Sequence, residues 1–172
     1  MSISKSEPHR IRTVSWDDPQ ISARDAISIS GLDYLRSIRE GRIKPPPVAM
    51  LIGYRLTEID LGRAVFELEP AECHYNPFAS VHGGIISTLL DTAMTAAILS
   101  TLPTGISCST LEIKVNFVRP ITNRTGLIRC EGKTVHIGSH TAIAEGKVID
   151  CQDKLHAHAV NTCMIFQAKQ ET

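Results

Sequence analysis

Asp91 is the residue whose type and position most strongly suggest chemistry. It is the only charged residue within 83–111, a stretch made otherwise of apolar, small and hydroxyl side chains. An ionised carboxylate in apolar surroundings is costly unless it is paired or hydrogen-bonded. Such a group is a candidate general base for water or a candidate nucleophile. The alternative is a structural carboxylate that is bonded by hydroxyl groups on the same helix, those of Ser87, Thr88 or Thr95.

Gly83 and Gly84 open the same apolar run. Glycines at the start of a helix leave backbone N–H groups accessible, and the helix dipole adds partial positive charge there. This end can bind an anion or polarise a carbonyl, as an oxyanion hole does. The alternative is that the glycines only permit a tight turn or close packing.

The spacing of Gly83 and Asp91 constrains how they can cooperate. They are eight residues apart, which is about 12 Å along a helix. One substrate carbonyl cannot contact both groups of a single chain at that separation. If both groups serve one site, two antiparallel helices related by a two-fold axis must combine them, and the protein is at least a dimer.

Three further polar residues are candidates for the same site. His82 could hold the loop before the helix or bond a substrate carbonyl. Asn76 precedes Pro77 and is typical of a turn, although its amide could position a water molecule. Thr110 lies on the next predicted strand, where its hydroxyl could bond water or Asp91, although threonine is common in strands for other reasons.

Other classes of site find little support in the sequence. His156 and His158 share one face of a predicted strand, but no third ligand is near, so no metal site is expected. Ser87 and Ser109 lack the G-x-S-x-G context of a serine hydrolase. There is no Walker or G-x-G-x-x-G motif, so no nucleotide cofactor is expected either.

The apolar pattern predicts the elements that position these residues. Residues 83–100 are apolar on nearly every side, which is typical of a buried helix. Residues 54–60 and 63–69 predict a hairpin, and four more strands are expected at 107–117, 126–136, 140–150 and 154–166. Short connections imply that these last four form an antiparallel meander. The expected fold class is α+β, with one curved antiparallel sheet around one long central helix.

The N-terminal part has a different pattern. Leu32, Leu35 and Ile38 recur at helical spacing and predict one helix over residues 22–42, packed on the domain as a peripheral cap. A triproline at 45–47 then forces an extended linker. We therefore divide the chain into an N-terminal extension, residues 1–47, and a main domain, residues 48–168, which opens with a short helical turn.

Composition narrows the class of protein. The chain has 172 residues, 42% of them hydrophobic, with zero net charge and a pI near 7.0, which fits one globular domain and argues against nucleic-acid or membrane-surface partners. Five widely spaced cysteines without a C-x-x-C pair and the absence of an apolar leader predict a cytoplasmic protein with reduced thiols. The hydroxyl groups and Asp91 within 85–102 argue against a membrane span.

Two quoted stretches resemble a known family. Residues 74–94, H-Y-N-P-F-A-S-V-H-G-G-I-I-S-T-L-L-D-T-A-M, and residues 110–120, T-L-E-I-K-V-N-F-V-R-P, resemble the hotdog-fold acyl-CoA thioesterases of the PaaI type. The resemblance covers residues 47–166. It implies a hotdog fold, with a curved sheet wrapped around one long helix, and it implies homodimers with paired helices, commonly dimers of dimers, that is, homotetramers.

The resemblance also implies roles for individual residues. Asp91 would be the general base or nucleophile at the thioester carbon, and the Gly83 N–H would bind the thioester oxygen. His82 and Asn76 would orient the thioester or water, and Thr110 would assist the water. The implied substrate-binding residues are Val81, Gly84, His136, Gly138, Ser139 and His140. Many relatives carry Arg or Lys where this chain has Ser139 and His140, so its other candidate phosphate contacts are Arg119, Arg124 and Lys133.

The expected reaction is hydrolysis of an acyl-CoA thioester to a carboxylate and free CoA, with CoA as part of the substrate and no cofactor. A hotdog hydratase or dehydratase is a second class, but its Asp/His pair needs a different spacing. A non-catalytic acyl-CoA-binding protein is the third class, although a sensor has no use for a buried base. The acyl group is not readable from the sequence.

Overall fold

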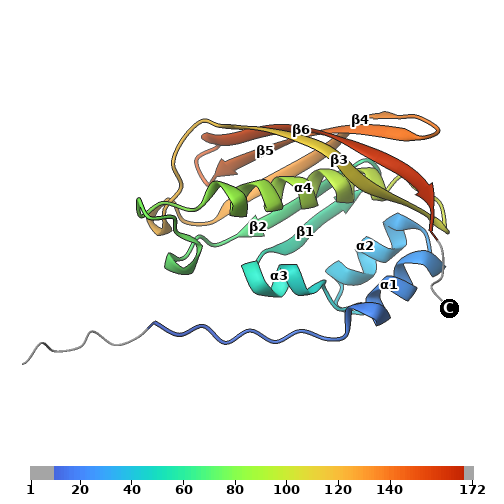
Figure 1. The fold of residues 1–172 in the computed structure, drawn as a ribbon, viewed down its shortest axis with the longest axis horizontal. Helices are drawn as coiled ribbons and strands as arrows, with labels where there is room; N and C mark the ends of the chain where they lie inside the picture. Colours follow the sequence, from blue (N-terminus) through green and yellow to red (C-terminus); the bar gives the residue numbers. More distant parts are fainter. Residues whose placement is uncertain (1–9, 169–172) are drawn as a thin grey trace, which may run out of the picture.

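The computed structural model describes residues 10–168, which form one curved six-stranded sheet around one long helix, with three short helices on the open side (Figure 1). The helices are α1 (Pro19–Ser28), α2 (Gly31–Arg39), α3 (Pro47–Ile52) and α4 (Gly83–Leu99). The strands are β1 (Arg55–Asp60), β2 (Arg63–Leu68), β3 (Ile106–Phe117), β4 (Ile128–Ile137), β5 (Thr141–Asp150) and β6 (Leu155–Gln167). The α+β hotdog architecture is confirmed.

The order of the strands corrects one expectation. The sheet runs β1-β2-β4-β5-β6-β3, and every neighbouring pair is antiparallel. Only β4, β5 and β6 form the expected meander, because β3 pairs with β6 and β4 pairs with β2. Ten residues separate β3 from β4. That connection is long enough to carry the chain to another strand of the sheet, so the two strands need not be hairpin partners.

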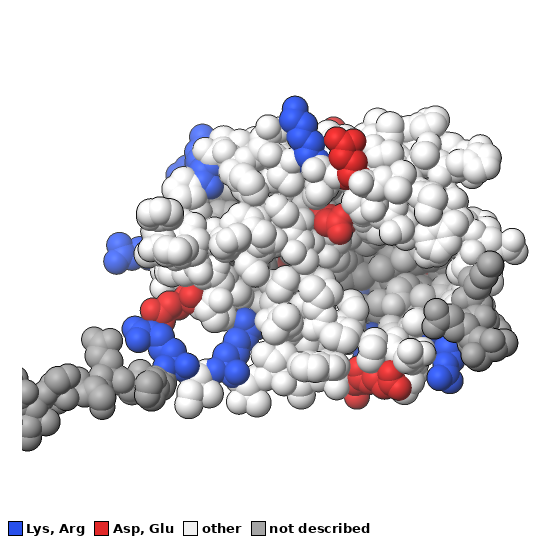
Figure 2. Space-filling view, in the orientation of Figure 1, with Lys and Arg blue, Asp and Glu red and all other residues white. Residues whose placement is uncertain are grey.

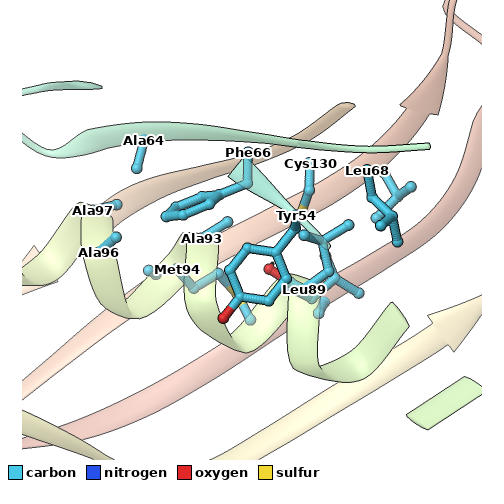
Figure 3. Packing of buried hydrophobic residues seen from close by; sticks show 14 of the residues in the cluster. Tyr54, Ala64, Phe66, Leu68, Leu89, Ala93, Met94, Ala96, Ala97 and Cys130 are labelled. Carbon is cyan, nitrogen blue, oxygen red and sulfur yellow. The ribbon is translucent and has the colours of Figure 1, made fainter. Parts of the chain in front are cut away.

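Helix α4 lies against the sheet at an unusually short distance. Gly132 on β4 pairs with Gly146 on β5, and the helix passes over this pair. A Cβ atom at Gly132 would lie 2.2 Å from the backbone oxygen of Ala93, and one at Gly146 would lie 2.9 Å from Met94 Cγ. Figure 3 shows the apolar side chains that fill the remaining space.

Among residues 10–168, none of the helices combines the length and the hydropathy that a membrane span requires.

The glycine pair generates a graded prediction for stability. Gly132→Ala should lower the free energy of unfolding by about 3 kcal/mol, because a backbone carbonyl cannot move out of the way of the new methyl group. Gly146→Ala is the matched comparison across the ladder and should cost about 1 kcal/mol, because the flexible Met94 side chain can shift. Urea unfolding of both variants measures the difference. Equal losses would contradict close backbone contact at Gly132.

The N-terminal extension holds two helices where one was expected. Ile29 is extended and breaks the helix, and the Ser30 hydroxyl then caps α2 by accepting from the Asp33 N–H. Gly31 lies against the C-terminal end of α4: its N–H donates to Leu102 O at 3.1 Å. A Cβ at this glycine would meet the carbonyl of α4's last residue at 1.9 Å. The extension therefore contributes to the core rather than forming only a peripheral cap: Leu35 belongs to the main cluster, and Leu32 and Tyr34 pack against it.

Helix α3, the expected helical turn, is held by a buried histidine. His74 Nδ1 accepts from the Ala71 N–H at 3.0 Å, so Nε2 carries the proton and donates to Ile52 O at 2.8 Å. Burial lowers the pKa of His74, the hydrogen bond to Ile52 opposes this, and the nearby Arg12 guanidinium lowers it further. The neutral ring joins the end of α3 to the loop before α4.

This histidine predicts a pH dependence of stability. An unfolded histidine takes up its proton as the pH falls below about 6.5, whereas folded His74 resists the proton. Stability should therefore be complete above this pH and fall as the pH decreases toward 5. His74→Gln should flatten this slope, and His140→Gln on the exposed β4–β5 hairpin is the matched control, which should keep it. Thermal unfolding at several pH values measures both. An unchanged slope in His74→Gln would assign it to another group.

Candidate active site

Asp91 lies half-buried on α4 and is held by a chain of hydroxyl groups. Thr110 on β3 donates its hydroxyl hydrogen to Asp91 Oδ1 at 2.7 Å. Thr95 lies 3.1 Å from the same Thr110 oxygen, and it must be the donor because the single hydrogen of Thr110 is committed to Asp91. Thr88, one of the expected same-helix partners, donates to Gly84 O instead. The carboxylate is therefore oriented from the sheet, with its other oxygen available.

A cleft of about 710 Å³ opens at this carboxylate; we call it the Asp91 cleft. Asp91 and Thr110 line it together, as the sequence predicted for a shared site. Tyr54 also lines it, and its hydroxyl accepts from Thr92 Oγ1 at 3.3 Å. Burial raises the pKa of Tyr54, the Thr92 hydrogen bond opposes this, and the charge of Asp91 raises it further. The side chain of Tyr54 is therefore uncharged where it lines the cleft.

The sequence did not indicate most of the cleft lining. The apolar spacing in α2 predicted a buried face, but it could not show that Leu35 and Ile38 face Asp91, 53 or more residues away. The residues that sequence reasoning missed come from α2, the proline segment, α3 and the first two strands: Tyr34, Leu35, Ile38, Pro45, Pro46, Val48, Ala49, Met50, Tyr54, Leu56 and Phe66.

Cys108 and Cys163 lie beside the threonines, but neither acts as a nucleophile in this arrangement. Cys108 lines the cleft. The hydrogen bond to Cys163 and burial raise the pKa of Cys108, so it stays a thiol. The hydrogen bond from Cys108 lowers the pKa of Cys163, against burial, but that side chain is fully buried and does not line the cleft. Asp91 is thus the carboxylate that the cleft exposes beside these thiols.

The start of α4 presents one available N–H group. His82 is the N-cap: its Nδ1 accepts from the Gly84 N–H at 2.8 Å, and its carbonyl accepts from Ile85 and Ile86. His82 thus holds the loop at the start of the helix, which is one of the two roles considered for it. The N–H of Gly83 has no partner within residues 10–168. A free donor at the positive end of a helix suits a developing oxyanion.

Gly83 lies in a second cleft, of about 320 Å³, which we call the Gly83 cleft. Asn76 and Val81 line it as well. The Asn76 side-chain oxygen accepts from the N–H groups of Phe78 and Ser80, so it shapes the loop in the way typical of a turn residue. Asp91 and Thr110 do not line this cleft. Within one chain the two halves of the predicted site are therefore apart.

The remaining candidates lie elsewhere. His136, Gly138, Ser139 and His140 are at the end of β4 and on the β4–β5 hairpin, and they line neither cleft. His156 bonds to Asp150 at 3.1 Å, and this hydrogen bond lowers the pKa of Asp150 to about 2. Across residues 10–168, no three His, Cys, Asp or Glu side chains are grouped so that they could hold a metal ion.

Known proteins match both the sequence and the fold. Residues 78–157 match the profile of the Thioesterase superfamily, which covers α4 through the start of β6. This match spans just under half of the chain. The chain is 29% identical over 119 residues, 69% of its own length and 94% of the relative, to a 1,4-dihydroxy-2-naphthoyl-CoA hydrolase of Listeria monocytogenes serotype 1/2a (strain 10403S). Its reaction class is thioester hydrolysis.

Two solved structures share the fold of this thioesterase. A phenylacetic acid degradation-related protein of Ralstonia eutropha JMP134 is 28% identical and superposes with a TM-score of 0.69, covering 76% of this chain and 98% of that protein. The PaaI protein of E. coli is 20% identical, with a TM-score of 0.70 over 81% of this chain and 99% of its own. The PaaI-type hotdog fold is thus shared at low sequence identity.

The hydroxyl chain generates a prediction for Thr110. Thr110→Val keeps the shape and removes the donor, so the carboxylate of Asp91 loses its orientation, and we expect kcat for thioester hydrolysis to fall about 10- to 100-fold. Thr110→Ser keeps the hydroxyl and should retain activity within about threefold. Thiol release from a thioester substrate measures both variants. Full activity in the valine variant would show that the hydrogen bond has no role in turnover.

Proposed function

We propose that the protein hydrolyses acyl-CoA thioesters at a site that two subunits of a homodimer form together. The observation that carries this proposal is the separation of the two functional groups. Asp91 and Gly83 belong to one helix and line different clefts, about 12 Å apart along the helix axis. A two-fold axis beside α4 would bring the Asp91 cleft of one protomer against the Gly83 cleft of its partner.

The two groups have complementary tasks in this arrangement. Asp91, acting as base, takes a proton from water while the water oxygen bonds to the thioester carbon. The carbonyl oxygen gains negative charge, and Gly83 of the partner subunit stabilises it with its free N–H. The C–S bond then breaks, and the CoA thiolate leaves and takes up a proton. In the nucleophile route, an Asp91 carboxylate oxygen bonds to that carbon, the C–S bond breaks and the CoA thiolate leaves and takes up a proton; water then hydrolyses the resulting anhydride to the free acid and Asp91.

Two observations support the dimer and the CoA ester. Strand β3 is an edge strand of twelve residues, and long exposed edges are usually covered by pairing. Leu111, Phe117 and Val118, on or just after β3, are 61%, 56% and 51% exposed, which fits a surface covered by a second copy. The Listeria relative is named as the hydrolase of a CoA ester. A dimer of dimers and a cytoplasmic location are further parts of the proposal.

Subunit mixing tests the shared site. Asp91→Asn removes the base, and Gly83→Pro removes the N–H while adding a ring whose Cβ would lie beside Phe117. Proline suits the first helical position, and extended His82 before it is compatible with proline. Each variant alone should lose at least about a hundredfold in thiol release from acetyl-, octanoyl- and phenylacetyl-CoA. Gly83→Ala keeps the N–H beside the same Phe117 contact and is the matched control.

After co-refolding in equal amounts, the two inactive variants should regain about a quarter of wild-type activity. Half of the dimers are then mixed, and each mixed dimer holds one intact site. If activity does not return although mixed dimers are detected by mass spectrometry, Asp91 and Gly83 act within one chain or not at all. Binding of CoA esters without any turnover by the wild type would favour the non-catalytic alternative.

A further inference from the structure

Residues of α2, the proline segment and α3 form one side of the Asp91 cleft. We propose that this side, which we call the extension wall, is the acyl pocket, and that it selects an apolar acyl group longer than acetyl. The inference rests on the proposed acyl-CoA hydrolysis and adds the class of acyl group and the residues that select it. The extension wall comprises Leu35, Ile38, Pro46, Val48, Ala49 and Met50.

The cleft is continuous from the catalytic carboxylate to the extension wall. Asp91 and Thr110 line the same 710 Å³ space as Ile38 and Met50. The opposite side is apolar too, with Leu56 and Phe66 from the sheet and Ala96 and Leu99 from α4. In Figure 2, uncharged atoms dominate this face of the molecule, which is hollowed between its upper and lower parts. A thioester whose carbonyl lies at Asp91 would therefore place its acyl tail against hydrocarbon.

Three polar side chains that line the cleft away from Asp91, those of Tyr34, Arg39 and Arg55, have partners in the protein. The Tyr34 hydroxyl is 2.8 Å from Ser22 Oγ. Arg55 bonds to Glu67 at 2.8 Å, and Arg39 lies 3.5 Å from the Glu40 carboxylate. The buried side-chain polar atoms left without a partner among the described residues belong to Thr134, His156 and Asn161, and none of these lines the cleft. The extension wall itself carries only apolar side chains, so a hydroxylated or charged acyl group placed against it would lose its hydration without compensation from those side chains.

The wall is fixed in place, so its position can define a size limit. Helix α2 is held at Gly31 by the hydrogen bond to Leu102 O. Helix α3 is held at its end by His74, through Ile52 O. Ala49 and Ile52 are buried in the main core. These contacts fix the position of α3, and Met50 on this helix lines the cleft.

Two adjacent residues of α3 provide a matched pair of variants. Met50 is 40% exposed and lines the cleft, whereas Leu51 is 58% exposed and does not. Met50→Trp adds bulk to the pocket, and Leu51→Trp adds the same side chain outside it. Thermal unfolding of both variants should match the wild type closely, because neither position is buried.

The experiment measures kcat/KM for acetyl-, butyryl-, hexanoyl- and octanoyl-CoA, with glutaryl-CoA and 4-hydroxyphenylacetyl-CoA for comparison. Wild-type kcat/KM should rise roughly fourfold per methylene until the pocket is full, and octanoyl-CoA should exceed both polar esters. The octanoyl-to-acetyl ratio should fall at least about tenfold in Met50→Trp and stay at the wild-type value in Leu51→Trp.

Three results would overturn the inference: a flat dependence on chain length, a preference for a polar acyl group, or an unchanged ratio in Met50→Trp. If the wild type hydrolysed none of these esters, that result would contradict the proposed function instead. In that case, calorimetric binding of the non-hydrolysable S-octyl-CoA and S-ethyl-CoA still tests the pocket. Tighter binding of the octyl ligand that Met50→Trp abolishes would support it, and equal affinities would reject it.

Discussion

The close approach of α4 to the paired glycines of β4 and β5 is the constraint on which the structure depends. A single methyl group at Gly132 would overlap the carbonyl of Ala93. Because the helix is seated at this point, Asp91, two residues earlier, reaches the hydroxyl of Thr110 on β3. A helix held a few ångströms further out would leave the carboxylate without its donor, and the cleft without one wall.

Every helix has backbone groups at its ends without partners inside the helix. In α4, the hydrogen bonds made at and just beyond the two ends position other parts of the structure. At the N-terminal end, His82 takes the Gly84 N–H and leaves that of Gly83 free. Past the C-terminal end, Ser100 accepts from the Gly62 N–H, and the Leu102 carbonyl accepts from Gly31. The first end holds the proposed oxyanion donor, and the second anchors the extension. One helix therefore links the proposed catalytic groups to the proposed acyl pocket.

Much of this arrangement was predictable from residue patterns. Alternation and turn residues placed every strand within about two residues of its observed bounds, and the isolated charge of Asp91 marked the site. Thr110 was a weak candidate by type, and its bond to Asp91 appears only once β3 lies beside α4. The strand order was not predictable, because a ten-residue connection between β3 and β4 permits several pairings. The break at Ile29 was missed because the apolar spacing of α2 masked it.

By itself, the sequence determined the elements, the buried helix and the choice of Asp91 as the candidate reactive carboxylate, because these depend on local periodicity and on the cost of burying a charge. It also required that Gly83 and Asp91 act across two helices if they act together, since helical rise is fixed. Only the tertiary structure decided which strands pair, that the two groups open into separate clefts, and that residues of α2 and α3 line the cleft of Asp91. Those features depend on contacts between residues far apart in the chain, which no local pattern encodes.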